Sequence, residues 1–116
     1  VTDQGAREGN YLESSATALF IYTLAKAVNK GYIGKDYIQP TRKAFDGMVK
    51  TFTRLEEDGS YTITNCCAVA GLGGDSKRYR DGSFEYYISE PVIENDPKSV
   101  GSFILAAIEY EKMTDK

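Results

Sequence analysis

The chain has 116 residues, enough for one domain with one core and too few for two ordinary domains. Its apolar (41%) and charged (27%) fractions are those of a folded globular protein, which argues against disorder and against membrane insertion. Its net charge is -3, so a nucleic-acid partner, which needs a basic face, is not expected. Histidine is absent, which excludes histidine triads and most zinc sites.

The start of the chain suggests a piece of a longer product. Val1 is not a plausible translation start, and the first dozen residues lack the basic and apolar regions of a signal peptide. We therefore expect residues 1–116 to form a single fragment of a larger domain, and the sequence leaves its compartment unknown.

The segment Tyr11–Lys30 predicts a long helix that is buried on most of its sides. Its apolar side chains surround the helix axis and do not form one stripe. Asn10 and Glu13 have the spacing of an N-cap and its reciprocal carboxylate, and Gly31 follows the last turn as a C-cap residue would.

A second helix is predicted from between Asp36 and Pro40 to about Leu55. Apolar residues recur there at intervals of three and four, so this helix should have one buried and one solvated face. Pro40 fits the first turn, where its missing N–H costs little. The segment 57–60 then predicts a turn, and Tyr61–Val69 predicts a strand rich in β-branched residues.

A glycine-rich loop beginning at Gly71 leads to the third helix. Its Phe84–Ile88 part is predicted to be a second short strand, after a turn at 81–82. Asp96 and Pro97 then have the residue types of an N-cap and a first helical position. The sequence therefore predicts an all-α protein of about three long helices, with a long loop and a short β-hairpin between the second and third.

The third helix, like the first, is apolar over much of its circumference. One amphipathic helix and a loop cannot cover two such helices. Either copies of the chain pack together, or the rest of the domain is missing.

Two groups of polar residues are candidates for ligand contacts. In the loop, Arg80 offers a planar fork to a carboxylate, and Tyr79 offers a ring face and a hydroxyl. The alternative is a solvated loop that covers the helix ends. The other group lies at the N-termini of the first and third helices, whose free N–H groups suit an anion. Plain helix capping is the alternative for Glu13 and for Asp96. No metal-ligand spacing and no phosphate loop are present.

Ordered motifs run through nearly the whole chain, at residues 3–5, 7–16, 69–74, 79–91 and 94–98 and at Gly101. With these motifs the chain resembles the C-terminal part of glycoside hydrolase family 105, the unsaturated rhamnogalacturonyl hydrolases. The resemblance implies an (α/α)6 barrel whose inner and outer helices alternate, with substrate entering at the N-terminal ends of the inner ones. The first and third helices would be inner and the second outer, so the chain would be roughly a third of the barrel.

The resemblance also implies an activity for the parent protein. Enzymes of this family remove an unsaturated uronic acid from the non-reducing end of oligosaccharides that pectin lyases produce. An aspartic acid protonates the C4=C5 vinyl ether, water adds, and the hemiketal opens with loss of the sugar. No metal or organic cofactor is implied, and the family suggests a bacterial cytoplasm or periplasm.

The family's catalytic aspartate lies in the earlier part of the barrel, and the motif assigns that role to none of Asp3, Asp81 and Asp96. This chain alone is therefore expected to be inactive and to contribute a wall of the substrate site. Its partners would be an unsaturated uronyl oligosaccharide and the remainder of the barrel, or further copies of itself. The alternative is a non-catalytic helical module that binds sugars or assembles into homo-oligomers. The candidate substrate-binding residues are Glu13, Ser15, Tyr79, Arg80, Asp81, Asn95 and Lys98.

Overall fold

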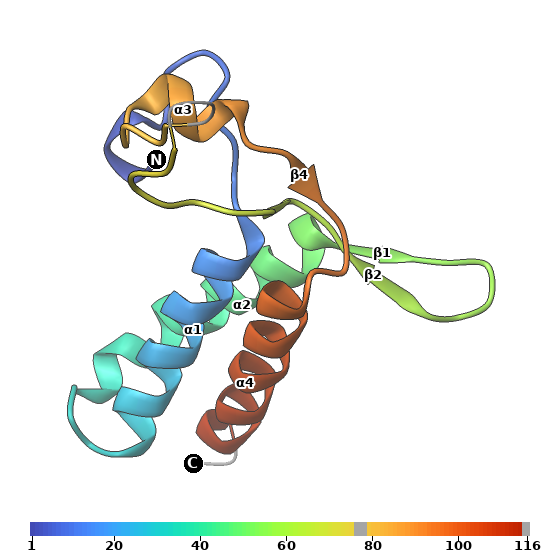
Figure 1. Ribbon diagram of the computed structural model, residues 1–116. Helices are drawn as coiled ribbons and strands as arrows, with labels where there is room; N and C mark the ends of the chain where they lie inside the picture. The colour runs from blue at the N-terminus through green and yellow to red at the C-terminus, as the bar shows by residue number, and fades with distance from the viewer. Residues whose placement is uncertain (76–78, 115–116) are drawn as a thin grey trace.

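The computed structural model describes residues 1–75 and 79–114, and three helices that pack side by side form its body (Figure 1). These are α1 (Ser14–Asn29), α2 (Ile38–Phe52) and α4 (Pro97–Thr114). Helices α1 and α4 run in the same direction and α2 runs against them (Figure 1). The predicted all-α architecture with three long helices is confirmed. Two short 3-10 turns, η1 (Thr2–Gln4) and η2 (Lys35–Tyr37), precede α1 and α2.

The N-cap of helix α1 lies three residues after the predicted one. Glu13 has extended backbone angles, and its carboxylate accepts a hydrogen bond from the Ala16 N–H, so Glu13 is the N-cap. The prediction that Asn10 caps this helix is wrong, because its side chain binds the backbone of the N-terminal segment instead. The predicted C-terminal cap is confirmed: Gly31 has a φ of +72° and donates to the Val28 carbonyl.

Helix α2 ends at Phe52, before the predicted end near Leu55, because the chain then enters a β-hairpin. Strand β1 (Thr53–Leu55) pairs antiparallel with β2 (Tyr61–Ile63). The turn between them contains Gly59 at a φ of +84°, a conformation that favours glycine. This hairpin projects sideways from the helices (Figure 1).

The predicted strand Tyr61–Val69 is interrupted at Asn65, whose φ is +59°. After this residue the chain forms a second short strand, β3 (Cys66–Cys67), in a different sheet. Its antiparallel partner is β4 (Val92–Ile93), which comes just before α4. The two-strand β3–β4 ladder therefore joins the end of the long loop to its beginning.

The prediction of a strand at Phe84–Ile88 is wrong, because these residues form the short helix α3 (Phe84–Ser89). Two side chains before the helix explain the difference. Ser83 accepts a hydrogen bond from the Tyr86 N–H, and Asp81 accepts one from the Ser83 N–H. A capped start outweighs the β-propensity of the tyrosines that follow.

Helix α4 begins as predicted, with Asp96 as N-cap and Pro97 as its first residue. The Asp96 carboxylate accepts a hydrogen bond from the Lys98 N–H at 2.8 Å. The start of α4 is thereby fixed next to the β3–β4 ladder.

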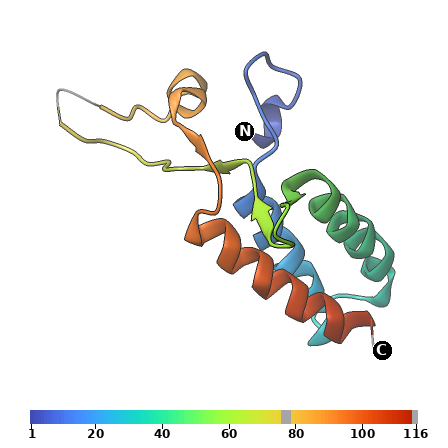
Figure 2. The same ribbon diagram turned by 90° about the vertical axis from the view of Figure 1, so that its right-hand side faces the viewer.

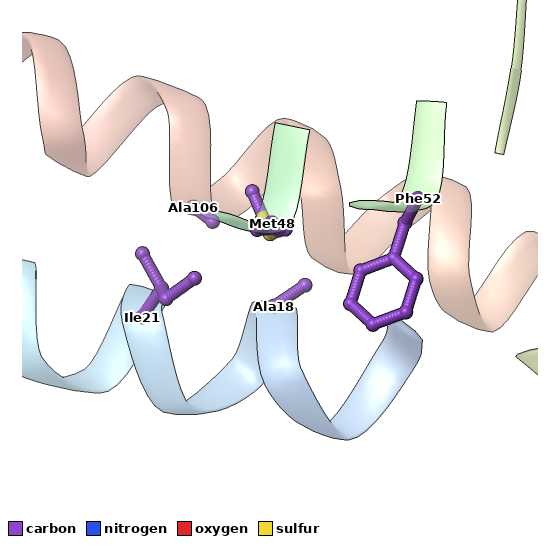
Figure 3. Packing of buried hydrophobic residues seen from close by; sticks show 5 residues of the cluster. All are labelled: Ala18, Ile21, Met48, Phe52 and Ala106. Atoms are coloured by element: carbon purple, nitrogen blue, oxygen red, sulfur yellow. The ribbon is translucent and has the colours of Figure 1, made fainter. Parts of the chain in front are cut away.

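Two clusters of buried apolar side chains hold the three helices together. In the first, residues of α1 and α4 point toward residues of α2 (Figure 3). It contains Ala18, Ile21, Met48, Phe52 and Ala106. The second lies toward the other end of α1 and contains Ala25, Val28 and Met113. Alanines at positions 18, 25 and 106 have no exposed surface, which allows α1 and α4 to approach closely.

The N-terminal segment and α3 form a separate layer at the end of the bundle where α1 and α4 begin (Figures 1 and 2). Arg7 links the two parts, since its guanidinium lies 3.9 Å from the centre of the Phe84 ring and pairs with Glu85. Within residues 1–75 and 79–114, no helix has both the length and the apolar character needed to cross a bilayer.

Asn95 connects the hairpin to the start of α4, and its substitution should weaken this junction. Its Oδ1 accepts a hydrogen bond from the Ile63 N–H at 2.9 Å, and its φ of +51° disfavours alanine. We expect Asn95→Ala to lower the free energy of unfolding by about 1–2 kcal/mol in urea denaturation. Asn95→Asp keeps an acceptor oxygen and should lose less, and equal losses would contradict this role.

Candidate functional site

A pocket of about 420 Å³ lies where the N-terminal ends of α1 and α4 meet the β3 strand. Helix α3 contributes one aromatic side chain to its wall. The residues that line the pocket are Glu13, Ser15, Ala16, Cys67, Ala68, Val69, Ala70, Tyr87 and Lys98. Three predicted contact residues, Glu13, Ser15 and Lys98, are thus brought together at one place.

Both carboxylate oxygens of Glu13 already accept hydrogen bonds from the protein. Oε2 accepts from the Ala16 N–H at 2.7 Å, and Oε1 accepts from the Cys67 N–H at 3.0 Å. The Ser15 hydroxyl also donates to this carboxylate. Glu13 therefore ties α1 to β3 and holds the Ser15 side chain, which makes it a positioning group in the pocket wall.

Lys98 is the only cation among the described residues that line this pocket. Its Nζ donates to Asp96 Oδ1 at 2.8 Å and to the Ala68 carbonyl at 3.0 Å. An ammonium has three N–H groups, so these two bonds leave one for a ligand. The hydrogen bond to Asp96 raises the pKa of Lys98, which keeps the ammonium charged near neutral pH.

Tyr87 is a pocket residue that is absent from the predicted contact set. Its ring stacks on Tyr11, with 5.6 Å between ring centroids and 8° between ring planes. It also borders a neighbouring hollow of about 550 Å³ along α1. Burial raises the pKa of both tyrosines, so both hydroxyls stay protonated. The sequence shows two adjacent tyrosines, but only the helical conformation of α3 decides which one faces the pocket.

The three loop candidates, Tyr79, Arg80 and Asp81, do not line this pocket. Tyr79 is 70% exposed, and the Asp81 carboxylate accepts a hydrogen bond from the Ser83 N–H at 2.8 Å. Arg80 faces Glu90, whose side chain has no exposed surface, with 3.8 Å between Arg80 Nε and Glu90 Oε1. The structure thus separates these residues from Glu13, Ser15 and Lys98.

Arg80 and Glu90 belong to a small network that fixes the glycine-rich loop. Gly73 and Arg80 exchange two backbone hydrogen bonds of 2.8 and 2.9 Å. The Tyr86 hydroxyl accepts a hydrogen bond from the Gly71 N–H at 3.2 Å. Burial, followed by the hydrogen bond with Glu90, raises the pKa of this tyrosine. The network therefore holds the segment that directly follows residues 68–70, which line the pocket.

Asn95 lies away from the pocket, against β2, as described above. It borders a different hollow of about 490 Å³, which Ile63, Phe103 and Ile104 also line. Its side-chain Oδ1 accepts a hydrogen bond from the Ile63 N–H, and its Nδ2 donates to the Thr62 hydroxyl. Asn95 therefore connects the hairpin to α4.

Neither Asp81 nor Asp96 has the properties of a general acid. The hydrogen bond from Ser83 lowers the pKa of Asp81, and the hydrogen bond from Lys98 lowers that of Asp96. A group that donates a proton near neutral pH needs a raised carboxyl pKa. Asp3, the third aspartate considered, lies in η1 and is exposed. In the part of the chain that the structure describes, no three His, Cys, Asp or Glu side chains are grouped to hold a metal.

Replacing Glu13 should separate the start of α1 from β3. Glu13→Ala removes the helix cap and leaves the Cys67 N–H without its acceptor, so we expect a loss of about 2–3 kcal/mol in the free energy of unfolding. Hydrogen exchange of the Ala16 and Cys67 amides measures this directly. Glu13→Gln retains one acceptor oxygen and is the matched control. Unchanged exchange at Cys67 in the alanine variant would refute the link.

A family model and two curated proteins match nearly the whole chain. The model described as Glycosyl Hydrolase Family 88 matches residues 1–114. "Protein Atu3128" of Agrobacterium fabrum is 38% identical over 113 residues, as is the "24.9 kDa protein in picA locus" of Rhizobium radiobacter. Each alignment covers 94% of this chain and 48% of the relative, so the chain spans about half the length of these relatives.

Solved structures give the same result for the fold. The family 105 glycoside hydrolase of C. acetobutylicum ATCC 824 is 44% identical, with a TM-score of 0.92. The match covers 96% of this chain and 30% of that one. A possible family 105 member from Salmonella enterica is 27% identical with a TM-score of 0.69, and the match covers 25% of its chain. The predicted resemblance is confirmed, and the fold is that of the C-terminal part of a family 105 helical barrel.

Proposed function

We propose, because the chain belongs to Glycosyl Hydrolase Family 88, that it forms one wall of the substrate site of a glycoside hydrolase. The substrate of the parent protein would be an oligosaccharide with an unsaturated uronic acid at its non-reducing end. The observation that carries this proposal is the pocket at the N-terminal ends of α1 and α4, where Glu13, Ser15 and Lys98 come together.

The chemistry of the pocket suits an anionic sugar. Lys98 offers a charged N–H to a carboxylate, and the Ser15 oxygen, whose hydrogen is directed at Glu13, can accept a hydrogen bond from a sugar hydroxyl. Tyr87 adds an aromatic wall next to both groups. Glu13 supports the pocket from behind because its oxygens are engaged with the backbone and with Ser15.

In the proposed reaction an aspartic acid protonates the C4=C5 double bond of the unsaturated sugar. Water adds at C5 to give a hemiketal, which opens and releases the rest of the oligosaccharide. The family resemblance implies that the proton donor comes from the earlier part of the barrel, and the lowered pKa values of Asp81 and Asp96 agree with this. This chain alone would bind and orient one part of the sugar without catalysing its cleavage.

The parent protein should remove the ultraviolet absorbance of lyase-generated unsaturated oligosaccharides, because hydration destroys the conjugated double bond. The 116-residue chain alone should leave this absorbance unchanged at the same concentration. A spectrophotometer measures both. A parent protein that is folded but leaves the absorbance intact would overturn the hydrolase proposal, and turnover by the isolated chain would overturn the assignment of the acid to another part.

A non-catalytic sugar-binding module is the second candidate, because Ser15, Tyr87 and Lys98 line one pocket together. Calorimetric titration of the chain with unsaturated uronic oligosaccharides tests this function. Lys98→Met should lose this binding because Lys98 lines the pocket, whereas Lys112→Met, in the last turn of α4, should keep it and is the matched control.

A further inference from the structure

Tyr87 lies where three hollows of the structure meet. It lines the pocket at the N-terminal ends of α1 and α4, which we call the Lys98 pocket, and the hollow of about 550 Å³ along α1. It also lines a third hollow of about 400 Å³ beside the glycine-rich loop. Among the described residues, no other lines all three. The Tyr87 side chain therefore forms the boundary between the Lys98 pocket and its two neighbours.

Tyr11 holds the Tyr87 ring from the side of the N-terminal segment. The two rings stack with 5.6 Å between their centroids and 8° between their planes. Tyr11 lines the hollow along α1 and does not line the Lys98 pocket. The Asn10 side chain accepts a hydrogen bond from the Tyr11 N–H and donates one to the Gln4 carbonyl, which anchors Tyr11 in its own segment. Two segments that are distant in the sequence thus fix one ring in the pocket wall.

The spaces on the two sides of this stack differ in chemistry. The Lys98 pocket contains an ammonium and the Ser15 hydroxyl, which suit a polar sugar ring. Leu12 and Phe20 contribute exposed apolar surface to the hollow along α1. An apolar group on a sugar, such as the methyl of an acetyl ester, would be stabilised by that surface. In its observed position the Tyr87 ring separates such a group from the surface that would bind it.

We propose that the stack of Tyr11 and Tyr87 determines which uronides the Lys98 pocket accepts. Tyr87 is the specificity-determining residue, because its ring leaves room for a uronyl ring with free hydroxyls and excludes one that carries an O-acetyl group. Tyr11 acts through Tyr87 and is a positioning residue. The identity of the sugar rests on the proposed function, whereas closure of the pocket by Tyr87 does not depend on it.

The first test compares an unsaturated uronide with its O-acetylated form as substrates of the parent protein. The ratio of the two kcat/KM values does not depend on the fraction of folded enzyme. We expect the parent to prefer the unsubstituted uronide by roughly 10- to 100-fold, and Tyr87→Ala and Tyr11→Ala to reduce this preference to about threefold or less. Tyr87→Phe and Tyr11→Phe retain both rings and should retain the preference.

Tyr32→Ala is the matched control, because Tyr32 is exposed and lines none of the three hollows. It should leave the preference unchanged. A parent without the preference, or a Tyr87→Ala variant that keeps it, would overturn the specificity role of Tyr87. A Tyr11→Ala variant that keeps the preference would overturn the positioning role of Tyr11.

A second test needs no substrate and uses a natural thiol in the pocket wall. Cys67 lines the Lys98 pocket and is 6% exposed, whereas Cys66 has no exposed surface. The parent protein is labelled with methyl or with benzyl methanethiosulfonate, and mass spectrometry follows the peptide that contains both cysteines. Each rate is divided by the rate for free cysteine, and a Cys67→Ser variant identifies the labelled thiol.

We expect the benzyl reagent to label Cys67 roughly tenfold more slowly than the methyl reagent, because the Tyr87 ring limits access, and Tyr87→Ala to remove this difference. Labelling that Tyr87→Ala leaves unchanged would overturn closure of the pocket by Tyr87. A folded parent that turns over neither uronide would overturn the proposed function, and the labelling rates would then decide the inference about Tyr87 by themselves.

Discussion

Arg80→Ala is expected to destabilise the glycine-rich loop more than any other single change considered for this chain. The variant removes the cation that faces Glu90, whose side chain has no exposed surface. Removing one partner of a buried pair is costly, and because Arg80 is about one third exposed, we expect a loss of about 3 kcal/mol. Hydrogen exchange at the Gly71 and Gly73 amides should accelerate by roughly 100-fold.

A second variant separates this explanation from a general loss of packing. Glu90→Gln removes the buried charge, so the double variant with Arg80→Ala should recover part of the lost protection. Glu94→Gln is the matched control, because Glu94 forms a half-exposed pair with Arg54 and should cost little. If the double variant exchanges as fast as Arg80→Ala alone, the ion pair is not what holds the loop.

The contact between Arg80 and Glu90 shows why this part of the candidate site could not be predicted from the sequence. An arginine beside a tyrosine in a loop is typical of a carboxylate-binding site, and the sequence cannot show that Glu90, ten residues after Arg80, turns toward it. The buried pair depends on α3, and α3 depends on the caps at Asp81 and Ser83. Once the tyrosine-rich segment is taken for a strand, side-chain directions in this region cannot be predicted correctly.

The long helices were predictable because their signals are repeated along many residues. The apolar content of α1 and α4, the caps at Gly31 and Asp96, and the position of Pro97 all agree with the structure. Short elements were not predictable in the same way, since β3 and β4 have two residues each and pair across about 25 positions of sequence. Glu13, Ser15 and Lys98 meet because α1 and α4 begin at the same end of the bundle (Figure 1).

Lys98 is expected to have the largest effect on substrate recognition in the parent protein. Lys98 is the only cation among the described residues that line the pocket. Hydrogen bonds to Asp96 and to the Ala68 carbonyl hold its ammonium at the N-terminal end of α4. A hydrogen bond to a charged group contributes about 1.5–3 kcal/mol, so Lys98→Met should raise KM for an unsaturated uronide by roughly 10- to 100-fold. Lys112→Met, in the last turn of the same helix, should leave KM unchanged and is the matched control.

The most direct test of the account compares two substrates that differ only at the uronic carboxylate. The parent protein and its Lys98→Met variant are each assayed with an unsaturated uronide and with its methyl ester, and the ratio of the two kcat/KM values is measured. This ratio does not depend on the fraction of folded enzyme. The account predicts that the parent prefers the free acid by at least roughly tenfold and that Lys98→Met abolishes the preference. A preference of the same size in the variant would contradict the claim that this chain supplies the carboxylate-binding wall.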